Sequence, residues 1–399
     1  MSKEKLIIIF TVAVDVIGLG IIIPVLPLYV ESFGTSAFTV TLLFSVFSLF
    51  SFVSAPFLGA LSDKIGRRPV LMASILSTSL GWFIFSFAKS LPVLFLGRII
   101  DGAAAGNFST AQSSIADLSK DDKERTANLG IIGMIFGLGF IVGPFIGGIL
   151  SKVSHSFPFL FVGALALLNV ILAYFFLPET NRHIDHDKKL TANPFKPLAA
   201  AVKNRTLRPL YLIWFIFNVV AVSANSIFAL FLYQAFGFSA FTAGLFFTGI
   251  GIVLALNQGL FIRRFWLKRF KEKQLILMML GAFALAYFLN SLRILPLFII
   301  GLIIGAFGQS TLNVAMTSEI IGQADIKERG EAVGVLSGIA SAAMVVAPLL
   351  SGATFTLNPS LPYIISAVLS ALAFLLMYKI HTNDRHPSPD IEAQAREVI

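Results

Sequence analysis

The sequence predicts an all-α integral membrane protein whose twelve transmembrane helices form two pseudo-symmetric six-helix bundles. Three observations carry this prediction: an apolar composition, twelve apolar stretches of membrane-spanning length, and an internal repeat. Of the 399 residues, 56% are hydrophobic and only 13% are charged, whereas about 25% of the residues in a soluble domain carry a charge. The mean hydropathy is +0.85. This composition excludes a soluble enzyme and, despite a net charge of +9, a nucleic-acid-binding protein.

A transmembrane helix needs about 20 mainly apolar residues to cross ~30 Å of hydrocarbon, because each backbone polar group must find its partner inside the helix. Twelve stretches have this length. They lie at 6–30, 39–61, 70–88, 92–116, 128–150, 157–177, 208–236, 242–262, 274–291, 295–318, 331–355 and 361–380. An even number of spans places both termini on the same side of the membrane.

The distribution of basic residues predicts the orientation. With a cytoplasmic N-terminus, 26 of the 30 Lys and Arg residues fall in inner segments, and only Lys89, Lys152 and Arg293 fall in outer loops. This bias follows the positive-inside rule and accounts for the basic charge without a nucleic-acid partner. We therefore expect a multi-pass protein of the plasma (bacterial inner) membrane with both termini in the cytoplasm.

An internal repeat divides the spans six and six. The longest polar stretch runs from 178 to 208, and a constant offset of 204 residues relates the chain on its two sides. This offset aligns Lys123–Gly130 with Lys327–Gly334, and Gly143–Gly148 with Ala347–Gly352. A duplicated six-helix unit in one orientation is typical of transporters that bind substrate between their halves. The expected parts are an N-terminal bundle (1–177), a cytoplasmic linker (178–207), a C-terminal bundle (208–380) and a polar tail (381–399).

A glycine-containing basic segment, Gly59–Val70, follows the second span. Gly66 permits a tight turn, Pro69 suits the first turn of a helix, and Arg67 and Arg68 bring two permanent charges to the membrane surface. The segment resembles the signature of the major facilitator superfamily, which implies the major facilitator fold.

Further segments resemble the drug/proton antiporters of that superfamily. Leu96–Gly102 and Gly139–Gly148 resemble their fourth- and fifth-helix motifs. Asp15–Gly20 followed by Pro24–Pro27, together with Pro178–Thr180, is most similar to the twelve-helix tetracycline/proton antiporter type. The resemblance implies an exporter that exchanges amphipathic small molecules or drugs, including antibiotics, for protons and needs no cofactor beyond the proton gradient.

The resemblance also implies a cytoplasmic latch. In the family, charges of this segment pair with an acidic residue at the inner end of the fourth helix and stabilise the outward-facing state. The matching residues here are Gly59, Asp63, Gly66, Arg67, Arg68 and Asp117. The alternative is that the arginines serve topology alone, but the positive-inside rule demands no particular Asp or Gly.

Small residues recur every four positions in the fifth span. Gly139, Gly143 and Gly147 share one helix face and allow another backbone to approach closely. Pro144 removes one internal hydrogen bond and bends the helix beside this face, and Gly148 completes the motif. We interpret this antiporter motif either as a pivot against a helix of the other half or as passive helix packing.

Three ionisable residues lie deep in the spans: Asp15, Arg98 and Asp101. Central charges cost about 2.5–3.5 kcal/mol on insertion scales, so such residues usually face a partner or a transport path. Arg98 and Asp101 are three residues apart on one helical face, and the spacing predicts an ion pair. Burial disfavours the charged form of a carboxyl, so we assign proton coupling to these three residues, with Asp15 the better carrier if the pair keeps Asp101 ionised.

Neutral amides are the other polar groups of the spans. The candidates for a substrate cavity are Asn107, Gln112, Asn218, Asn225, Gln234, Asn257, Gln258, Gln309 and Asn313. Amides and aromatic rings suit an amphipathic solute better than a polyvalent anion, although some amides can instead join helices. Leu285 and Leu254 stand where the tetracycline antiporters carry an acid and a histidine, so tetracycline does not follow as the substrate.

The remaining classes of function find little support. The chain has no cysteine, and its five histidines lie outside the spans, which leaves neither a metal site nor a nucleophile and base for intramembrane catalysis. No Gly-rich nucleotide-binding loop indicates ATP. We expect a monomer in the lipid bilayer whose partners are a small-molecule substrate and protons. A facilitator or proton-linked exporter of a metabolite, a siderophore-like compound or a lipid precursor is the alternative.

Overall fold

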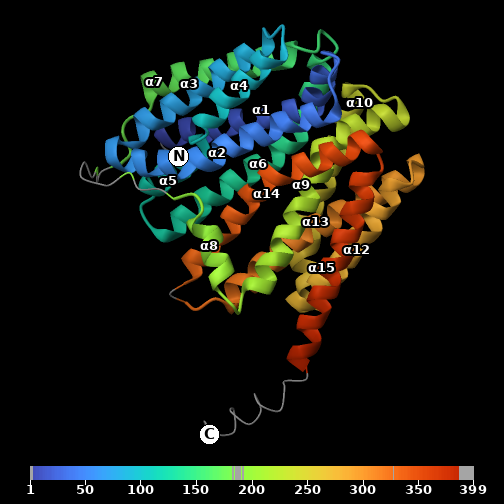
Figure 1. The fold of residues 1–399 in the computed structure, drawn as a ribbon. Coiled ribbons are helices and arrows are strands. Elements are labelled where there is room, and N and C mark those ends of the chain that lie inside the picture. The colour runs from blue at the N-terminus through green and yellow to red at the C-terminus, as the bar shows by residue number, and fades with distance from the viewer. Residues whose placement is uncertain (1–2, 182–183, 185–189, 191–192, 327, 386–399) are drawn as a thin grey trace. The chain divides into compact units, whose positions relative to one another are not determined.

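The computed structural model describes all residues except 1–2, 182–183, 185–189, 191–192, 327 and 386–399 (Figure 1). Every regular element of the described part is a helix, and eleven of these helices are long and apolar enough to cross a membrane. The all-α membrane fold is therefore confirmed. Most of the predicted tail and part of the predicted linker lie outside the described residues.

The first half of the chain supplies six spans in seven helices. These are α1 (Lys3–Glu31), α2 (Ala37–Ile65), α3 (Arg67–Ser86), α4 (Leu91–Ala103), α5 (Asn107–Asp117), α6 (Asp122–Leu150) and α7 (Phe157–Phe176). A short helix, α8 (Lys196–Lys203), lies within the predicted linker. The second half contains α9 (Arg208–Phe236), α10 (Ala240–Leu256), the π-helix η1 (Asn257–Trp266), α11 (Leu267–Arg269), α12 (Glu272–Ser291), α13 (Leu295–Gln323), α14 (Arg329–Leu357) and α15 (Leu361–Arg385).

The internal repeat appears in the positions of the helices. The 20-residue helices α3 and α12 begin at Arg67 and Glu272, 205 residues apart, and α7 and α15 begin at Phe157 and Leu361, 204 residues apart. These offsets agree with the register of 204 that the sequence motifs predict. The two halves therefore repeat one order of spans.

The expectation of one continuous fourth span over 92–116 is wrong. Helix α4 ends at Ala103, and after a turn in which the Ala105 amide donates to the Gly102 carbonyl (3.2 Å), α5 begins at Asn107. The physical reason is that residues 107–117 are mostly polar and small, so no apolar face continues the helix through the glycines.

The eighth span is not α-helical throughout. Its inner part, η1, is a π-helix, an uncommon geometry that is frequent at functional sites.

The chain forms two compact units. The first comprises Met1–Lys196, Val222–Ile252 and Ser341–Pro359, and the second Pro197–Ala221, Val253–Ala340 and Ser360–Ile399. The first unit therefore contains the first six spans together with one end of each of α9, α10 and α14. Because this division cuts three helices, it does not follow the boundaries expected at residues 177 and 207, which stay a prediction.

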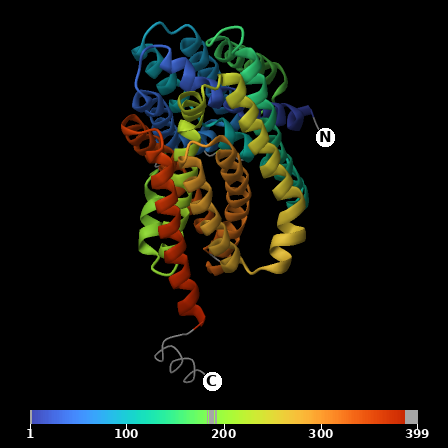
Figure 2. The same ribbon diagram turned by 90° about the vertical axis from the view of Figure 1, so that its right-hand side faces the viewer.

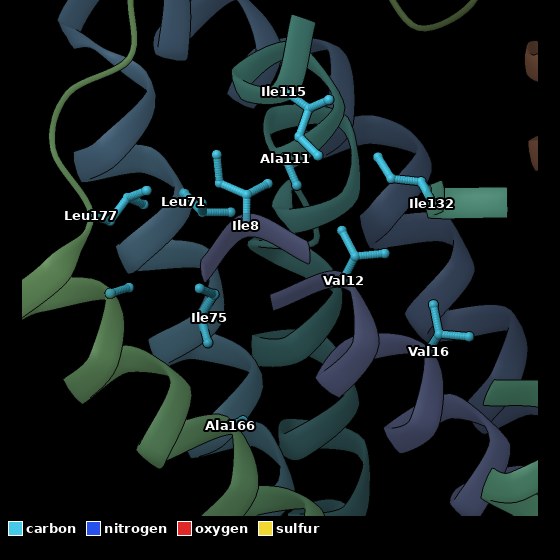
Figure 3. Close-up of a cluster of buried hydrophobic side chains, with 11 residues drawn as sticks. Ile8, Val12, Val16, Leu71, Ile75, Ala111, Ile115, Ile132, Ala166 and Leu177 are labelled. Atoms are coloured by element: carbon cyan, nitrogen blue, oxygen red, sulfur yellow. The ribbon is translucent and has the colours of Figure 1, made fainter. Parts of the chain in front are cut away.

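Aliphatic side chains fill the interior of the first unit. Figure 3 shows Ile8 of α1 beside Leu71 of α3, and Val12 and Val16 of α1 and Ile75 of α3 belong to the same buried cluster. Side chains of α5, α6 and α7 complete this cluster. Burial of each such side chain stabilises the fold by about 1.5–3 kcal/mol.

In the second unit, α12 packs most extensively against α13 and α15, and Figure 2 shows these helices from the side. Large apolar side chains are exposed elsewhere on the spans, for example Phe175 at 71% and Leu357 at 80%. Exposure of this extent is typical of a surface that contacts lipid.

Candidate functional site: the charged groups of the first unit

A single glycine separates α2 from α3, so the predicted loop is much shorter than expected. Gly66 has φ +105°, a conformation that favours glycine. Arg67, the first residue of α3, pairs with Asp63 of α2 (Nη1–Oδ1 2.5 Å) and with Asp117 of α5 (Nε–Oδ2 3.2 Å). Its Nη1 also donates to the Ser62 hydroxyl at 2.6 Å. Arg67 thus joins the ends of α2, α3 and α5, and the latch function of these contacts stays a prediction.

Glu179 lies beside the expected latch residues, and the sequence analysis did not assign it to the site. Its carboxylate accepts hydrogen bonds from the backbone amides of Arg67 (2.9 Å) and Arg68 (3.1 Å) at the start of α3. A carboxylate there accepts hydrogen bonds from amides that lack an intrahelical partner, and its negative charge interacts favourably with the positive end of the helix dipole. A Cβ on Gly66 would collide with the Glu179 carboxylate, so the glycine provides room as well as a positive φ. Arg68 donates to the Tyr174 carbonyl (2.6 Å).

The other expected latch residue, Gly59, lies within α2, and a Cβ built on it would meet nothing within 4 Å. Its position therefore does not require a glycine for packing in this structure.

Deep inside the unit, α4 carries the ion pair that the spacing predicts. Arg98 Nη1 lies 3.7 Å from Asp101 Oδ2, and the two residues are 3% and 4% exposed. Aromatic rings surround the guanidinium, whose Cζ lies 3.8 Å from the Trp82 ring centroid, 5.0 Å from that of Phe85 and 5.4 Å from that of Phe47. Among the described residues, Nε and Nη2 find no hydrogen-bond partner. Rings and one carboxylate, rather than a set of hydrogen bonds, therefore hold this charge.

Asp15 lies in the middle of α1 and is half-buried. Helical spacing puts it on the face that also carries Ile8 and Thr11, two turns and one turn away. Thr11 donates to the amide oxygen of Asn169 in α7 at 3.1 Å. Asp15 thus shares the side of α1 that has polar neighbours within the first bundle, and it does not join Arg98 and Asp101 on one helix.

Another ion pair joins the starts of α1 and α6. Lys5, only 6% exposed, lies 2.5 Å from Glu124 through Nζ and Oε1. The Lys120 amide also donates to Glu124 at 2.7 Å. The hydrogen bond from Lys5, followed by that from Lys120, lowers the pKa of the Glu124 carboxyl. The sequence analysis did not predict this pair, whose members are 119 residues apart.

The glycine face of α6 packs against α1. A Cβ on Gly143 would lie 2.7 Å from the Gly20 Cα, and one on Gly139 would lie 2.6 Å from a Val16 methyl. A Cβ on Gly147 would collide with the Ile21 carbonyl. The predicted close backbone approach is therefore present, within the first bundle.

The neighbouring face of α6 meets the part of α10 that belongs to the same unit. A Cβ on Gly148 would lie 3.0 Å from the Phe241 Cα, and one on Gly244 would collide with the Pro144 carbonyl. Just beyond the end of α6, Lys152 Nζ lies 3.7 Å from the Phe241 ring centroid. Helix α6 therefore contacts one helix of each half along adjacent faces.

The amide candidates occupy different environments. Asn257 is fully buried, donates to the Thr311 hydroxyl (2.9 Å) and accepts from the Trp266 indole (2.9 Å), so it joins helices. Asn218 donates to the Trp214 carbonyl in its own helix. The side chain of Asn107 lies outside the described part of the structure. The remaining candidates are exposed or half-buried: Gln112, Asn225, Gln234, Gln258, Gln309 and Asn313.

Two repeated sets of spanning helices, with ionisable residues enclosed in one of them, define a membrane transporter. The sequence profile of the Major Facilitator Superfamily matches residues 8–289 and 259–398. The chain belongs to the Major Facilitator Superfamily. It is therefore a multi-pass membrane transporter and not an enzyme, and transport in this superfamily needs no resident cofactor.

Known proteins resemble the chain over nearly its whole length. It is 31% identical over 382 residues to the "Tetracycline resistance protein, class C" of Escherichia coli, covering 92% of this chain and 95% of that protein. It is 28% identical over 401 residues to the "Quinolone resistance protein NorA" of Staphylococcus aureus, covering 96% and 98%. The fold is shared with the nucleoside transporter NupG, at a TM-score of 0.77, 13% identity and coverage of 96% of this chain and 99% of that one.

Proposed function

We propose that this transporter exports amphipathic small molecules, antibiotics among them, in exchange for protons. The observation that carries the proposal is the enclosed ion pair of Arg98 and Asp101 in a chain similar, from end to end, to a tetracycline and a quinolone resistance protein. A solute pump driven by protons needs a group inside the protein that gains and loses a proton. A facilitator of neutral solutes has no such need.

In this proposal, Asp15 and the Arg98–Asp101 pair have different roles in proton coupling. The Arg98 guanidinium favours the carboxylate form of Asp101, whereas burial favours its neutral form, and Asp15 is the better carrier if the ion pair keeps Asp101 ionised. Asp15 lies on another helix and is half-buried. We therefore assign the travelling proton to Asp15 and a modulating role to the pair.

In this proposal, alternating access uses the charged contacts around Arg67 and the two faces of α6 that pack against α1 and α10. The residues of α6 and α10 that meet, such as Gly148 and Phe241, lie at the helix ends that the charge distribution assigns to the outer face. A Cβ on Gly352 of α14 would collide with the Thr41 hydroxyl of α2 at the same outer level. These contacts hold the outer ends of the two repeats together, and transport requires that they separate. The charges around Arg67 lie at the opposite, inner end.

Substrate recognition is assigned to the amides that the structure leaves accessible or half-buried. Neutral hydrogen-bonding groups among aromatic rings fit amphipathic molecules and leave polyvalent anions without sufficient counter-charge. We place the protein as a monomer in the bacterial inner membrane with both termini in the cytoplasm, as the 26 inner cations favour.

Reconstituted vesicles test the proposal. The purified protein is placed in liposomes that contain a pH-sensitive dye, and the movement of ethidium, a fluoroquinolone and a tetracycline is followed with and without a pH gradient. We expect uphill movement of at least one compound with opposite proton flux, and loss of the uphill movement, but not of exchange, in Asp15→Asn. The exposed Asp325→Asn is the matched control.

Two outcomes would contradict the proposal. Equal flux with and without the gradient would make the protein a facilitator, and unchanged uphill transport by Asp15→Asn would remove the assigned proton carrier.

A further inference from the structure

Five cations gather where the span Ala240–Arg269 ends. They are Arg263, Arg264, Lys268, Arg269 and Lys271, all of them exposed, and we call this stretch, 263–271, the basic segment. Within the described residues none of the five forms an ion pair, whereas the nearby Lys273 pairs with Glu319 at 3.5 Å. So many like charges in one short stretch repel one another unless an anion lies among them.

Comparison with the first repeat shows which acidic residues have no counterpart near the basic segment. At the offset of 204 residues, the basic segment 263–271 corresponds to residues 59–67, which contain the expected latch residues between α2 and α3. Lys271 occupies the position equivalent to Arg67. In the first half, three carboxylates receive the latch arginine and the start of its helix. The residues at the equivalent positions to Asp63, Asp117 and Glu179 are neutral: Leu267, Ile321 and Asn383. The second half thus keeps cations at this membrane surface, but its residues at these three positions carry no carboxylate.

Aromatic contacts hold part of the basic segment in place. The Trp266 indole donates to Asn257 (2.9 Å), which donates in turn to Thr311 of α13 (2.9 Å). Phe265 packs edge-on against Trp266 at 4.9 Å, and the Arg269 guanidinium lies 4.5 Å from the Phe265 ring centroid. A cation that is already positioned loses less conformational entropy when it binds an anion.

We infer that the basic segment binds the phosphate of an anionic phospholipid headgroup. Guanidinium groups match phosphate oxygens in pairs, and clusters of Lys and Arg beside a span attract anionic lipids. The occupant is a lipid rather than free phosphate because apolar side chains continue the surface: Leu260, Phe261 and Leu267 are 47%, 41% and 40% exposed. These side chains offer the acyl chains a contact directly beside the charges.

Native mass spectrometry of the full-length protein tests the inference. The detergent-purified protein is titrated with phosphatidylglycerol and with phosphatidylcholine of the same acyl chains. Each cation near an anionic surface contributes about fivefold to affinity, so two contacting cations give an expected preference of about 25-fold for phosphatidylglycerol. The variant with Arg263, Arg264, Lys268 and Arg269 all changed to Gln should lose this preference.

Two further variants separate charge from folding and from general attraction. Changing the three arginines to Lys should preserve most of the preference, because the charges remain. An equal charge removal at another basic stretch, Lys196, Lys203, Arg205 and Arg208 all to Gln, should leave it unchanged. The inference is overturned if the wild type binds both lipids equally, if the basic-segment variant keeps the preference, if the control loses it as fully, or if millimolar inorganic phosphate displaces the lipid.

Discussion

Trp82 lies over the buried Arg98 guanidinium, and its replacement by Leu removes this cation–π contact. The ring centroid lies 3.8 Å from Arg98 Cζ, and Trp82 is 3% exposed. A desolvated cation–π contact of this kind is worth about 2 kcal/mol. The variant also loses apolar contacts and leaves a cavity, so its total destabilisation cannot be assigned to the cation alone.

A double-mutant cycle isolates the contact. The four proteins are the wild type, Trp82→Leu, Arg98→Met and the double variant, and their free energies of unfolding are measured by reversible unfolding in mixed SDS and detergent micelles. The cost of leaving Asp101 without its guanidinium enters both arms that lack Arg98 and cancels. We expect an interaction energy of about 2 kcal/mol, or about thirtyfold in the unfolding equilibrium.

The conservative variant Trp82→Phe provides a second check, because a smaller ring keeps a face for the guanidinium. It should retain at least half of the interaction energy with Arg98. An interaction energy below about 0.5 kcal/mol in the Leu cycle would show that the ring merely fills space, and our account of how the buried charge is held would be wrong.

Three further predictions follow from the other contacts. Glu179→Gln should lower the free energy of unfolding by about 1 kcal/mol, because an amide has one acceptor oxygen for two backbone donors; an unchanged melting temperature would contradict the helix-capping role. Gly143→Ala should cost more than about 1 kcal/mol in the same assay, since its Cβ would lie 2.7 Å from a Cα of α1, whereas Gly137→Ala, which meets nothing within 4 Å, should be tolerated. Because the pKa of Glu124 is lowered in the folded protein, the stability from its pair with Lys5 is present above the ordinary pKa of 4.5 and is lost as the pH falls through the lowered value. The difference in melting temperature between wild type and Lys5→Gln should therefore shrink on acidification, and a constant difference would refute the linkage.

The sequence was sufficient to predict features that repeat or that act locally. The length of the apolar stretches predicts the spans, and the common offset of 204 residues predicts the repeat. The three-residue spacing predicts the ion pair of Arg98 and Asp101. Each of these depends on residues close together in the chain or on a pattern extended over many residues. The close approach of Gly143 to α1 also followed, because a four-residue glycine period has one packing consequence.

Contacts between distant residues could not be predicted in the same way. Glu179 lies 112 residues from Arg67, whose amide donates to it, and no local pattern indicates which helix end a carboxylate will reach. The break between α4 and α5 was missed because mean hydropathy over the fourth span hides the polar character of residues 107–117. The hydrogen bond from the Trp266 indole to Asn257, which joins the two ends of the π-helix, is likewise visible only in the folded geometry.

The repeat makes the distribution of charge informative. At an offset of 204, the counterparts of Asp15, Arg98 and Asp101 are Val219, Leu302 and Gly305. The scaffold was therefore duplicated, but the enclosed ionisable groups are present in one copy only. A carrier whose proton-binding groups all lie in one half can change its charge there while the other half remains neutral. Because a central charge costs about 2.5–3.5 kcal/mol in a span, we expect protonation in that half to alter the balance between conformations without an opposing change in the other half. This asymmetry gives a physical reason to look for coupling in the first repeat, and for substrate discrimination among the neutral amides of the second.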